Sequence, residues 1–352
     1  LLRDKPLQPL AQETIVVQSE GVGRWLKLSL AERLGVAASM RFPFPASYVW
    51  ELVANIIPDV PRESPLAPEV LKWRAAAALA RVAGDPRFAA ISRYLADGDP
   101  LKAYQLAERL ATVLDHYLVY RPDWIAAWSQ GRDAHLGADE IWQAALWREI
   151  ATGLPEGAKT DPRERFLNAI DASAAARAAL PERIHLFAVE ALPPPHLDFF
   201  RRIAQHRDVR LWIVNPCREY WPLIEDPRRV ARARVEAGPD ASHRETGNRL
   251  LASLGRHGRA LIDAVVDDPG GAEGEYADPA DARSTLLAAL QSDVLALRER
   301  GDAGAPLLDF DPGDRSLAVH VCHSPMREIE VLHDQLLDRL ERDPTLRAAD
   351  VL

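Results

Sequence analysis

The stretch that decides the fold is TIVVQSEGVGRWLKLSLAERL, residues 14–34. Its apolar run at residues 15–17 predicts a short strand buried on both faces. A polar turn follows, and the apolar residues after it recur mostly at helical spacing. Strand, polar loop and helix form the unit of open parallel sheets, in which ligands bind at the carboxyl ends of the strands. The segment from Gln18 to Arg24 is therefore a candidate site, although any parallel α/β domain contains such a unit.

The chain repeats this unit twice. Strands are predicted at residues 184–189 and 209–214, with a helix between them, and again at 318–322, before a helix whose N-cap is Ser324 and whose first residue is Pro325. Between and around these units the pattern is helical, with predicted helices at 69–82, 101–120, 138–152, 163–179, 250–266 and 285–300. The predicted fold class is therefore α/β, a parallel sheet with a large helical insertion.

Composition indicates a globular protein. The chain has 352 residues, of which 47% are hydrophobic and 27% charged, enough for two or three domains. No apolar run approaches the roughly 20 residues that span a bilayer, and no signal peptide opens the chain, so we expect a cytoplasmic protein without a membrane partner. The sequence lacks an initiator Met, and a new apolar run begins at its last two residues. We therefore expect it to be a piece of a longer protein. Cys217 and Cys322 suggest no disulfide framework.

Charge and aromatic residues leave nucleic-acid binding open. A net charge of −9 argues against indiscriminate coating of DNA but not against a local basic groove. Phe44 lies between two prolines, a stiff loop in which the ring either stacks on a base or anchors the loop in the core. Tryptophans at 73, 124, 128, 142 and 147 are better explained by helix packing than by a stacking platform. Five polar or amphipathic residues, 115–117, 120 and 121, gather at a helix end, which is either solvated or in contact with nucleic acid.

The motifs of ATP-driven motors are absent from the sequence. The nearest approach to a P-loop, at residues 153–160, has the wrong spacing and follows a helix. The strand at 184–189 leads to Glu190 instead of ending in a magnesium-binding Asp, so a usual Mg²⁺ site is not expected there. No carboxylate cluster of a metal nuclease is recognisable. A zinc site at His320, Cys322, His323 and His333 is rejected because alternate residues of a strand point to opposite faces.

Several stretches in this order resemble the RecC family, the gamma subunit of the exodeoxyribonuclease V (RecBCD) helicase–nuclease: IVVQSEGVGRWLKLSLAERLGVAASMRFPFPASYVW, LDHYLVYRPDW, RIHLFAVEALPP, NPCREYW, GNRLLASLGRHGR and VHVCHSPMREIEVLHDQLLDRLERDPTL. The resemblance implies a degenerate superfamily 1 helicase-like fold, with a P-loop/RecA-like parallel sheet and a large inserted helical domain. It implies these parts: the first RecA-like domain at 1–65 and 181–225, the inserted helical domain at 66–180, a helical connector at 226–312, and the start of the second RecA-like domain at 313–352.

The resemblance also implies a function. A RecC-like chain has no catalytic site or metal of its own; RecB and RecD are its partners, and ATP and Mg²⁺ are used by those subunits. It carries the 3′-ended single strand of a forked DNA and recognises the hotspot Chi. The positions that read Chi in the family fall here on Gln18, Glu20, Arg24, Phe44, Trp50, Thr112, Asp115, Arg121 and Lys159.

These positions differ in how well they match the family. Gln18, Trp50, Asp115 and Arg121 keep the residue type, and Phe44 and Lys159 are conservative replacements. The remaining three, Glu20, Arg24 and Thr112, depart from the pattern, which leaves the hotspot sequence open.

The chemistry of these residues suits an unpaired strand. Gln18 and Arg121 can bind base edges, Asp115 can orient Arg121 or accept from a cytosine amine, and the rings of Phe44 and Trp50 can stack on bases. An active ATP-dependent helicase or nuclease and a scaffold that only holds partner subunits remain the alternatives.

Overall fold

The computed structural model describes residues 2, 6–8, 11–155, 158, 161–237, 245–266, 274–301 and 304–351. The chain divides into two compact units. The first comprises residues 1–187 and 192–212, and the second comprises residues 188–191 and 213–352. The five-part division expected from the RecC resemblance stays a prediction.

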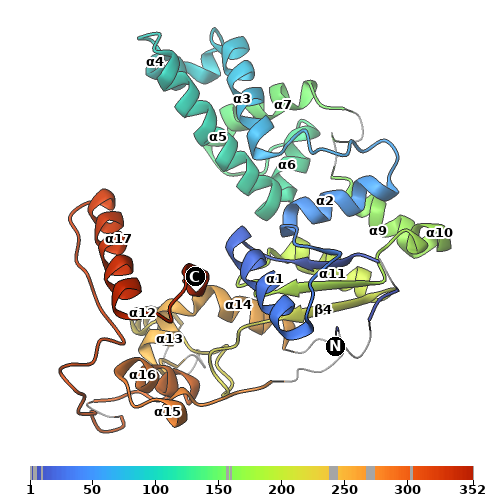
Figure 1. Cartoon of the computed structure of the whole chain (residues 1–352). Coiled ribbons are helices and arrows are strands. Elements are labelled where there is room, and N and C mark those ends of the chain that lie inside the picture. The colour runs from blue at the N-terminus through green and yellow to red at the C-terminus, as the bar shows by residue number, and fades with distance from the viewer. Residues whose placement is uncertain are drawn as a thin grey trace. The chain divides into compact units, whose positions relative to one another are not determined.

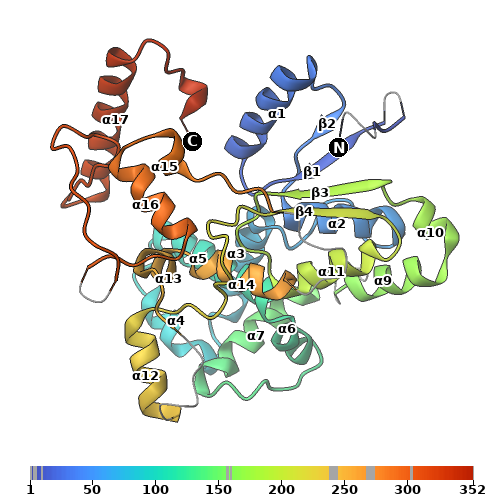
Figure 2. The same cartoon turned by 90° about the horizontal axis from the view of Figure 1, so that it is seen from below.

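The first unit contains a parallel sheet of four strands in the order β2-β1-β3-β4. Its strands are β1 (Glu13–Val16), β2 (Met40–Arg41), β3 (Arg183–Phe187) and β4 (Asp208–Trp212). Helix α1 (Glu20–Leu34) lies on one side of this sheet, and α2 (Pro45–Ile56), α9 (Arg163–Ala172) and α11 (Pro194–Ala204) lie on the other (Figure 1, Figure 2). The predicted α/β class with a parallel sheet is confirmed for this unit.

The opening strand and helix form as their sequence predicts. All four residues of β1 are buried, and the side chains of Ile15 and Val17 pack with Leu26 of α1. Ser19 caps α1 by accepting a hydrogen bond from the Val22 amide at 3.2 Å, and Gly35 ends the helix at a φ of 85°. Helix α1 therefore covers the face of β1 to which its odd-numbered residues point.

The same face carries a buried polar network that crosses three strands. The Glu13 carboxylate of β1 accepts hydrogen bonds from Arg183 Nε of β3 at 3.0 Å and from His185 Nε2 at 3.0 Å. His185 Nδ1 in turn accepts a hydrogen bond from Trp212 Nε1 of β4 at 3.0 Å. These bonds require a neutral His185 that carries its proton on Nε2. The network fixes the lateral order of β1, β3 and β4.

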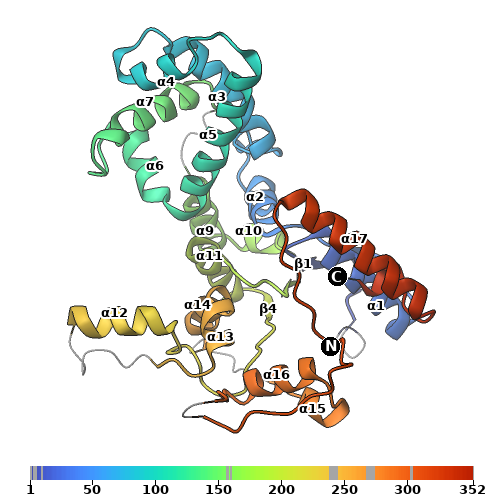
Figure 3. The same ribbon diagram turned by 90° about the vertical axis from the view of Figure 1, so that its left-hand side faces the viewer.

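A helical bundle occupies most of the segment between β2 and β3 (Figure 3). Its core contains Leu71, Trp128 and Trp147, each at most 1% exposed. The indole of Trp128 donates to Glu140 Oε1 at 2.7 Å, so this ring is a packing residue, as predicted. Trp73 is the exception, with 60% of its surface exposed. The elements are α3 (Pro68–Val82), η1 (Pro86–Phe88), α4 (Ala89–Tyr94), α5 (Pro100–Tyr120), α6 (Pro122–Ser129) and α7 (Ala138–Thr152).

Two predicted helices are each divided in the structure. The helix expected at 163–179 is α9 followed by α10 (Ala174–Ala178), because Ser173 adopts an extended conformation and caps α10 through its hydroxyl. The helix expected at 250–266 is α13 (Arg249–Leu254) followed by α14 (Arg256–Val265), with Gly255 between them. Hydrophobic periodicity runs through both breaks, so it does not reveal them.

The second unit is helical in its described part. Cys217, Trp221 and Leu251 belong to its small buried core. The strand expected at 318–322 is wrong: the segment has no regular structure, and Val319 and Val321 are 82% and 97% exposed. A strand needs hydrogen-bonded neighbours, and none of the described residues provides one here. Besides α13 and α14, the helices are α12 (Pro227–Ala237), α15 (Pro279–Ala282), α16 (Leu286–Leu295), α17 (Pro325–Arg342) and η2 (Ala348–Asp350).

Helix α17 begins as predicted, with Ser324 accepting from the Arg327 amide at 3.3 Å and Pro325 at the first position. The helix expected at 285–300 ends earlier, at Leu295, and Leu297 follows with a φ of 52°. None of the helices within the described ranges combines the length and the apolar composition needed to cross a bilayer.

Candidate nucleic-acid interface

The carboxyl edge of the sheet presents residues that follow β1 and β2. Gln18 comes two residues after β1 and is exposed, and Phe44 follows its neighbour β2 with 40% of its surface exposed. The Val17 amide donates a hydrogen bond to the Pro43 carbonyl at 3.0 Å, which ties the two segments together. Because the strands are parallel, Gln18 and Phe44 emerge at the same edge.

Helix α1 adds two charged residues to this edge. Glu20 occupies the first position of the helix and Arg24 lies one turn later; both side chains are exposed. The helix approaches the β2 loop closely at Gly23, where a Cβ would lie 3.1 Å from Phe42 Cβ and 3.4 Å from Val17 Cγ2. The absence of a side chain at Gly23 therefore sets how near Glu20 and Arg24 lie to the strand ends.

Helix α2 positions the two predicted stacking rings. Phe44 is its N-cap residue and Pro45 its first residue, so the backbone on both sides of the Phe44 ring is fixed. Trp50 is half-buried, and its indole Nε1 donates to the Pro61 carbonyl at 2.9 Å. This bond satisfies the only polar atom of the Trp50 side chain, so any contact with a base would use the ring itself.

The end of α5 holds a second group of predicted residues. Thr112 is exposed, and its hydroxyl donates back to the Glu108 carbonyl at 3.0 Å. Asp115 is half-buried, and burial raises the pKa of its carboxyl group, with the Glu69 carboxylate adding to the rise and His116 opposing it. A carboxyl group in this environment can both donate and accept hydrogen bonds when protonated, which suits contacts with base edges.

Arg121 ends α5 and is held from two sides. Its Nε and one terminal nitrogen donate to the Asp123 carboxylate at 3.2 and 3.1 Å, and its guanidinium carbon lies 4.0 Å from the centroid of the Trp124 ring. Asp123, and not Asp115, is thus the carboxylate that these bonds pair with Arg121. The sequence could have indicated this pair, because Asp123 lies two residues after Arg121, in the first turn of α6.

The predicted residues thus form two groups. Gln18, Glu20, Arg24 and Phe44 follow the carboxyl ends of β1 and β2, with Trp50 further along α2, and Thr112, Asp115 and Arg121 lie along the C-terminal part of α5. Helix α5 contacts α11, which lies on the sheet. Lys159 lies outside the described residues, and so do Gly157 and Thr160 of the nearest P-loop approach. A common role for the two groups stays a prediction.

The end of β3 carries none of the acidic residues of a motor ATPase. Phe187 closes the strand and stacks with Trp25 of α1, with ring centroids 6.4 Å apart. Ala188 follows with a φ of 49°, and the nearby carboxylate, Glu190, is exposed. Within the described ranges, no group of three or more His, Cys, Asp or Glu side chains is placed to hold a metal ion.

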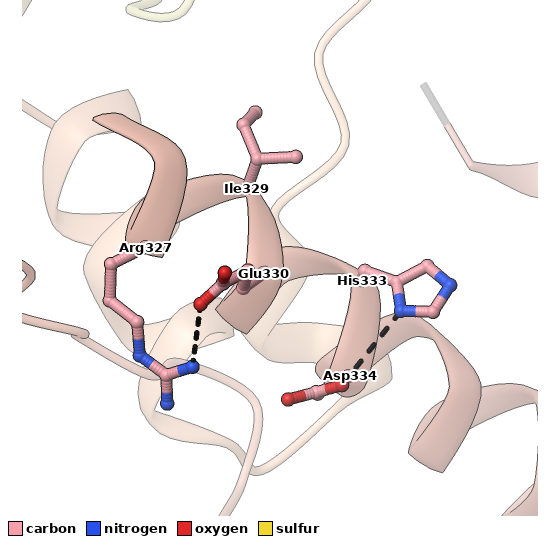
Figure 4. A pocket seen from close by; sticks show the side chains of 5 residues that line it. All are labelled: Arg327, Ile329, Glu330, His333 and Asp334. Atoms are coloured by element: carbon pink, nitrogen blue, oxygen red, sulfur yellow. Dashed lines mark hydrogen bonds and ion pairs between the residues drawn. The ribbon is translucent and has the colours of Figure 1, made fainter. Parts of the chain in front are cut away.

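A shallow pocket on α17 in the second unit has no evident role. Arg327 pairs with Glu330 at 3.0 Å, and His333 Nδ1 lies 3.8 Å from an Asp334 oxygen (Figure 4). All four side chains are about half exposed or more, as expected of ion pairs on a solvated helix face.

Comparison with known proteins gives consistent results. The family model described as the N-terminal domain of RecC matches residues 1–297. The RecBCD enzyme subunit RecC of Escherichia coli K12 is 34% identical over 99% of this chain and 34% of its own length. The proteins of the same name from Haemophilus influenzae and Mycobacterium tuberculosis are 30% and 32% identical, over 99% and 100% of this chain and 35% and 32% of their own lengths. The chain spans about a third of the length of these relatives.

Proposed function

The chain belongs to the RecC family, and from that premise we propose that it is part of a non-catalytic DNA-binding subunit of a RecBCD helicase–nuclease. In this proposal its partners are RecB and RecD, ATP and Mg²⁺ are used by those subunits, and the fold is a degenerate helicase-like one. The subunit channels the 3′-ended single strand of a forked DNA and recognises a Chi-type hotspot during recombination and repair of double-strand breaks. Recognition of the hotspot regulates the partner nuclease.

One observation carries most of the proposal. An amide side chain, Gln18, and an exposed ring, Phe44, follow neighbouring parallel strands and emerge at one edge of the sheet. An unpaired base has a flat face, on which the Phe44 ring can stack, and a polar edge, to which the Gln18 amide can hydrogen-bond.

The end of α5 supplies the complementary chemistry. Arg121 can donate two parallel hydrogen bonds to the acceptors of guanine, but it must first leave the Asp123 carboxylate. The planar guanidinium lies over the Trp124 ring, and the Arg121 side chain is still 46% exposed. Arg121 is thus poised for exchange between an internal partner and a base.

The departures from the family pattern bear on specificity. Glu20 puts a negative charge at the edge of the sheet. Arg24 offers a positive charge there, and Thr112 offers an uncharged hydroxyl on α5. Carboxylates accept from the amine of cytosine and repel phosphates. We therefore propose that the hotspot read by this protein differs in sequence from the one read by family members that lack these residues.

The test uses the full-length protein purified with its partner subunits. Arg121→Ala should weaken binding of single-stranded DNA that contains the preferred sequence by about 1–3 kcal/mol and should reduce the preference over scrambled DNA. Arg132→Ala is the matched control, since Arg132 is an exposed arginine of the same bundle that hydrogen-bonds Gln130. If both variants bind like the unaltered protein while the complex assembles normally, the chain is a scaffold and the proposal is wrong.

A further inference from the structure

Helices α3 and α5 carry an aromatic pair that is not among the predicted site residues. Trp73 of α3 packs against Tyr104 of α5, with ring centroids 5.7 Å apart and ring planes inclined by 52°. Trp73 is 60% exposed, whereas Trp128 in the same bundle is fully buried. Tryptophan is highly buried on average, so a Trp ring with more than half of its surface in water, packed on a second ring, is a candidate contact surface.

A lysine accompanies both rings. The Nζ atom of Lys72 lies 5.7 Å from the centroids of both Trp73 and Tyr104 and donates to the Tyr104 hydroxyl at 3.4 Å. Within the part of the chain that the structure describes, the hydrogen bond of Lys72 goes to the Tyr104 hydroxyl and no carboxylate lies within ion-pair distance. A positive charge without an acidic partner beside two flat rings is the combination that single-strand binding proteins use for phosphates and bases.

The aromatic pair lies on the same side of α5 as two predicted site residues. Positions 104, 108, 112 and 115 recur at helical spacing, so Tyr104 shares a face with Thr112 and Asp115. Helix α3 packs against α5, and the carboxylate of Glu69 near the start of α3 adds to the rise that burial causes in the pKa of Asp115. Tyr104 and Asp115 are separated by about 16 Å along the helix.

We propose that Lys72, Trp73 and Tyr104 form a base-stacking site for single-stranded nucleic acid, which extends the predicted strand path along α3 and α5. This inference rests on the proposed function. Glu108 is exposed on the same face of α5 and repels phosphates, so the backbone of the strand runs on the Lys72 side while its bases face the rings. A protein partner would gain from the rings as well. A lysine with no carboxylate partner among the described residues, together with the continuity with Thr112 and Asp115, favours a polyanion with flat bases.

The experiment uses the full-length protein purified with its partner subunits and single-stranded oligonucleotides carrying 5-iodouracil at successive positions. Ultraviolet cross-linking and peptide mapping should find Trp73 or Tyr104 joined to the strand. Trp73→Ala should weaken binding about fivefold, the lower end for loss of a stacking residue, and Trp73→Phe should recover most of that loss.

Tyr94 provides a matched control. It is 48% exposed and lies 4.3 Å from Lys102 Nζ, but Lys102 is paired with Asp97 at 2.8 Å. The Tyr94 ring therefore faces a neutralised charge, and Tyr94→Ala should leave binding unchanged. Equal effects of Trp73→Ala and Tyr94→Ala would overturn the inference.

The remaining outcomes separate this inference from the proposed function. Cross-links at Phe44, Trp50 or Arg121 without any at Trp73 or Tyr104 would refute the stacking site and leave the proposed function standing. The absence of cross-links throughout the chain, with normal binding by Arg121→Ala, would refute both. Loss of subunit assembly in Trp73→Ala, with normal DNA binding by the remaining complex, would identify a protein interface and also refute the stacking site.

Discussion

Replacement of Glu13 by Gln tests whether the buried network organises the sheet. The Glu13 side chain is 10% exposed, and the side chains of its partners Arg183 and His185 are 5% and 4% exposed. Gln keeps the size of the side chain but removes its charge, and it offers Arg183 one acceptor where the carboxylate offers two. The variant therefore leaves the guanidinium of Arg183 buried without a full counter-charge.

The size of the effect follows from the pKa of Glu13. Burial alone would raise this pKa, but hydrogen bonds from His185 and Arg183 outweigh burial and lower it from 4.5 to about 2. That fall corresponds to roughly 3 kcal/mol. Because a Gln side chain can still accept one hydrogen bond from Arg183, the expected loss of unfolding free energy is smaller, about 2 kcal/mol.

The assay is urea unfolding at pH 7, combined with hydrogen exchange of peptides from β1 and β3. Glu13→Gln should lower the unfolding free energy and speed exchange in both strands. Asp59→Asn is the control, because Asp59 forms an exposed pair with Arg165 and its loss should not change stability measurably. Equal behaviour of Glu13→Gln and Asp59→Asn would refute the reasoning.

The pH dependence gives a second check. A lowered carboxyl pKa stabilises the fold above pH 4.5, and this contribution is lost as the pH falls from 4.5 through about 2. The difference between the unaltered protein and Glu13→Gln should therefore shrink over this window. A difference that stays constant down to pH 2 would show that the carboxylate charge is not its origin.

Three further predictions follow from other buried or paired groups. Burial lowers the pKa of His196 from 6.5 to about 4, so its protonation should cost up to about 3 kcal/mol of stability as the pH falls from 6.5 to 4, and His196→Phe should abolish that loss in pH-dependent unfolding. Trp128→Phe should cost about 1–3 kcal/mol, measured by denaturant unfolding, because the buried carboxylate of Glu140 loses a hydrogen-bond donor. Asp123→Asn should free the guanidinium of Arg121 and raise the affinity for single-stranded DNA about two- to fivefold in a binding titration, and weaker binding would contradict this.

The sequence determines the elements whose boundaries are coded locally. The helix predicted at 138–152 is found as α7, and α17 starts at the predicted cap, because Pro, Gly and Ser fix helix ends through the backbone and through hydrogen bonds within a few residues. The parallel class of the sheet was likewise predictable, since alternating strands and helices leave few other arrangements.

The site was only partly predictable. Gln18 and Phe44 could be placed at one edge because the carboxyl ends of parallel strands share that edge. The pairing of Arg121 with Asp123 was missed, since a side chain chooses among nearby carboxylates by geometry and not by order in the chain. The exposure of Trp73 was also missed, because helical periodicity cannot tell which rings the neighbouring helices leave uncovered.

By itself, the amino-acid sequence determined what depends on near neighbours: the helices with their caps, the first strand and its loop, and the absence of a P-loop signature. Only the tertiary structure decided what depends on distant partners. Glu13 and His185 are 172 residues apart in sequence and lie in hydrogen-bond contact, whereas residues 318–322 have the composition of a strand and form none in the described part of the chain. A helix satisfies its backbone within one segment, but a strand or a buried charge is stable only when another segment supplies its partner.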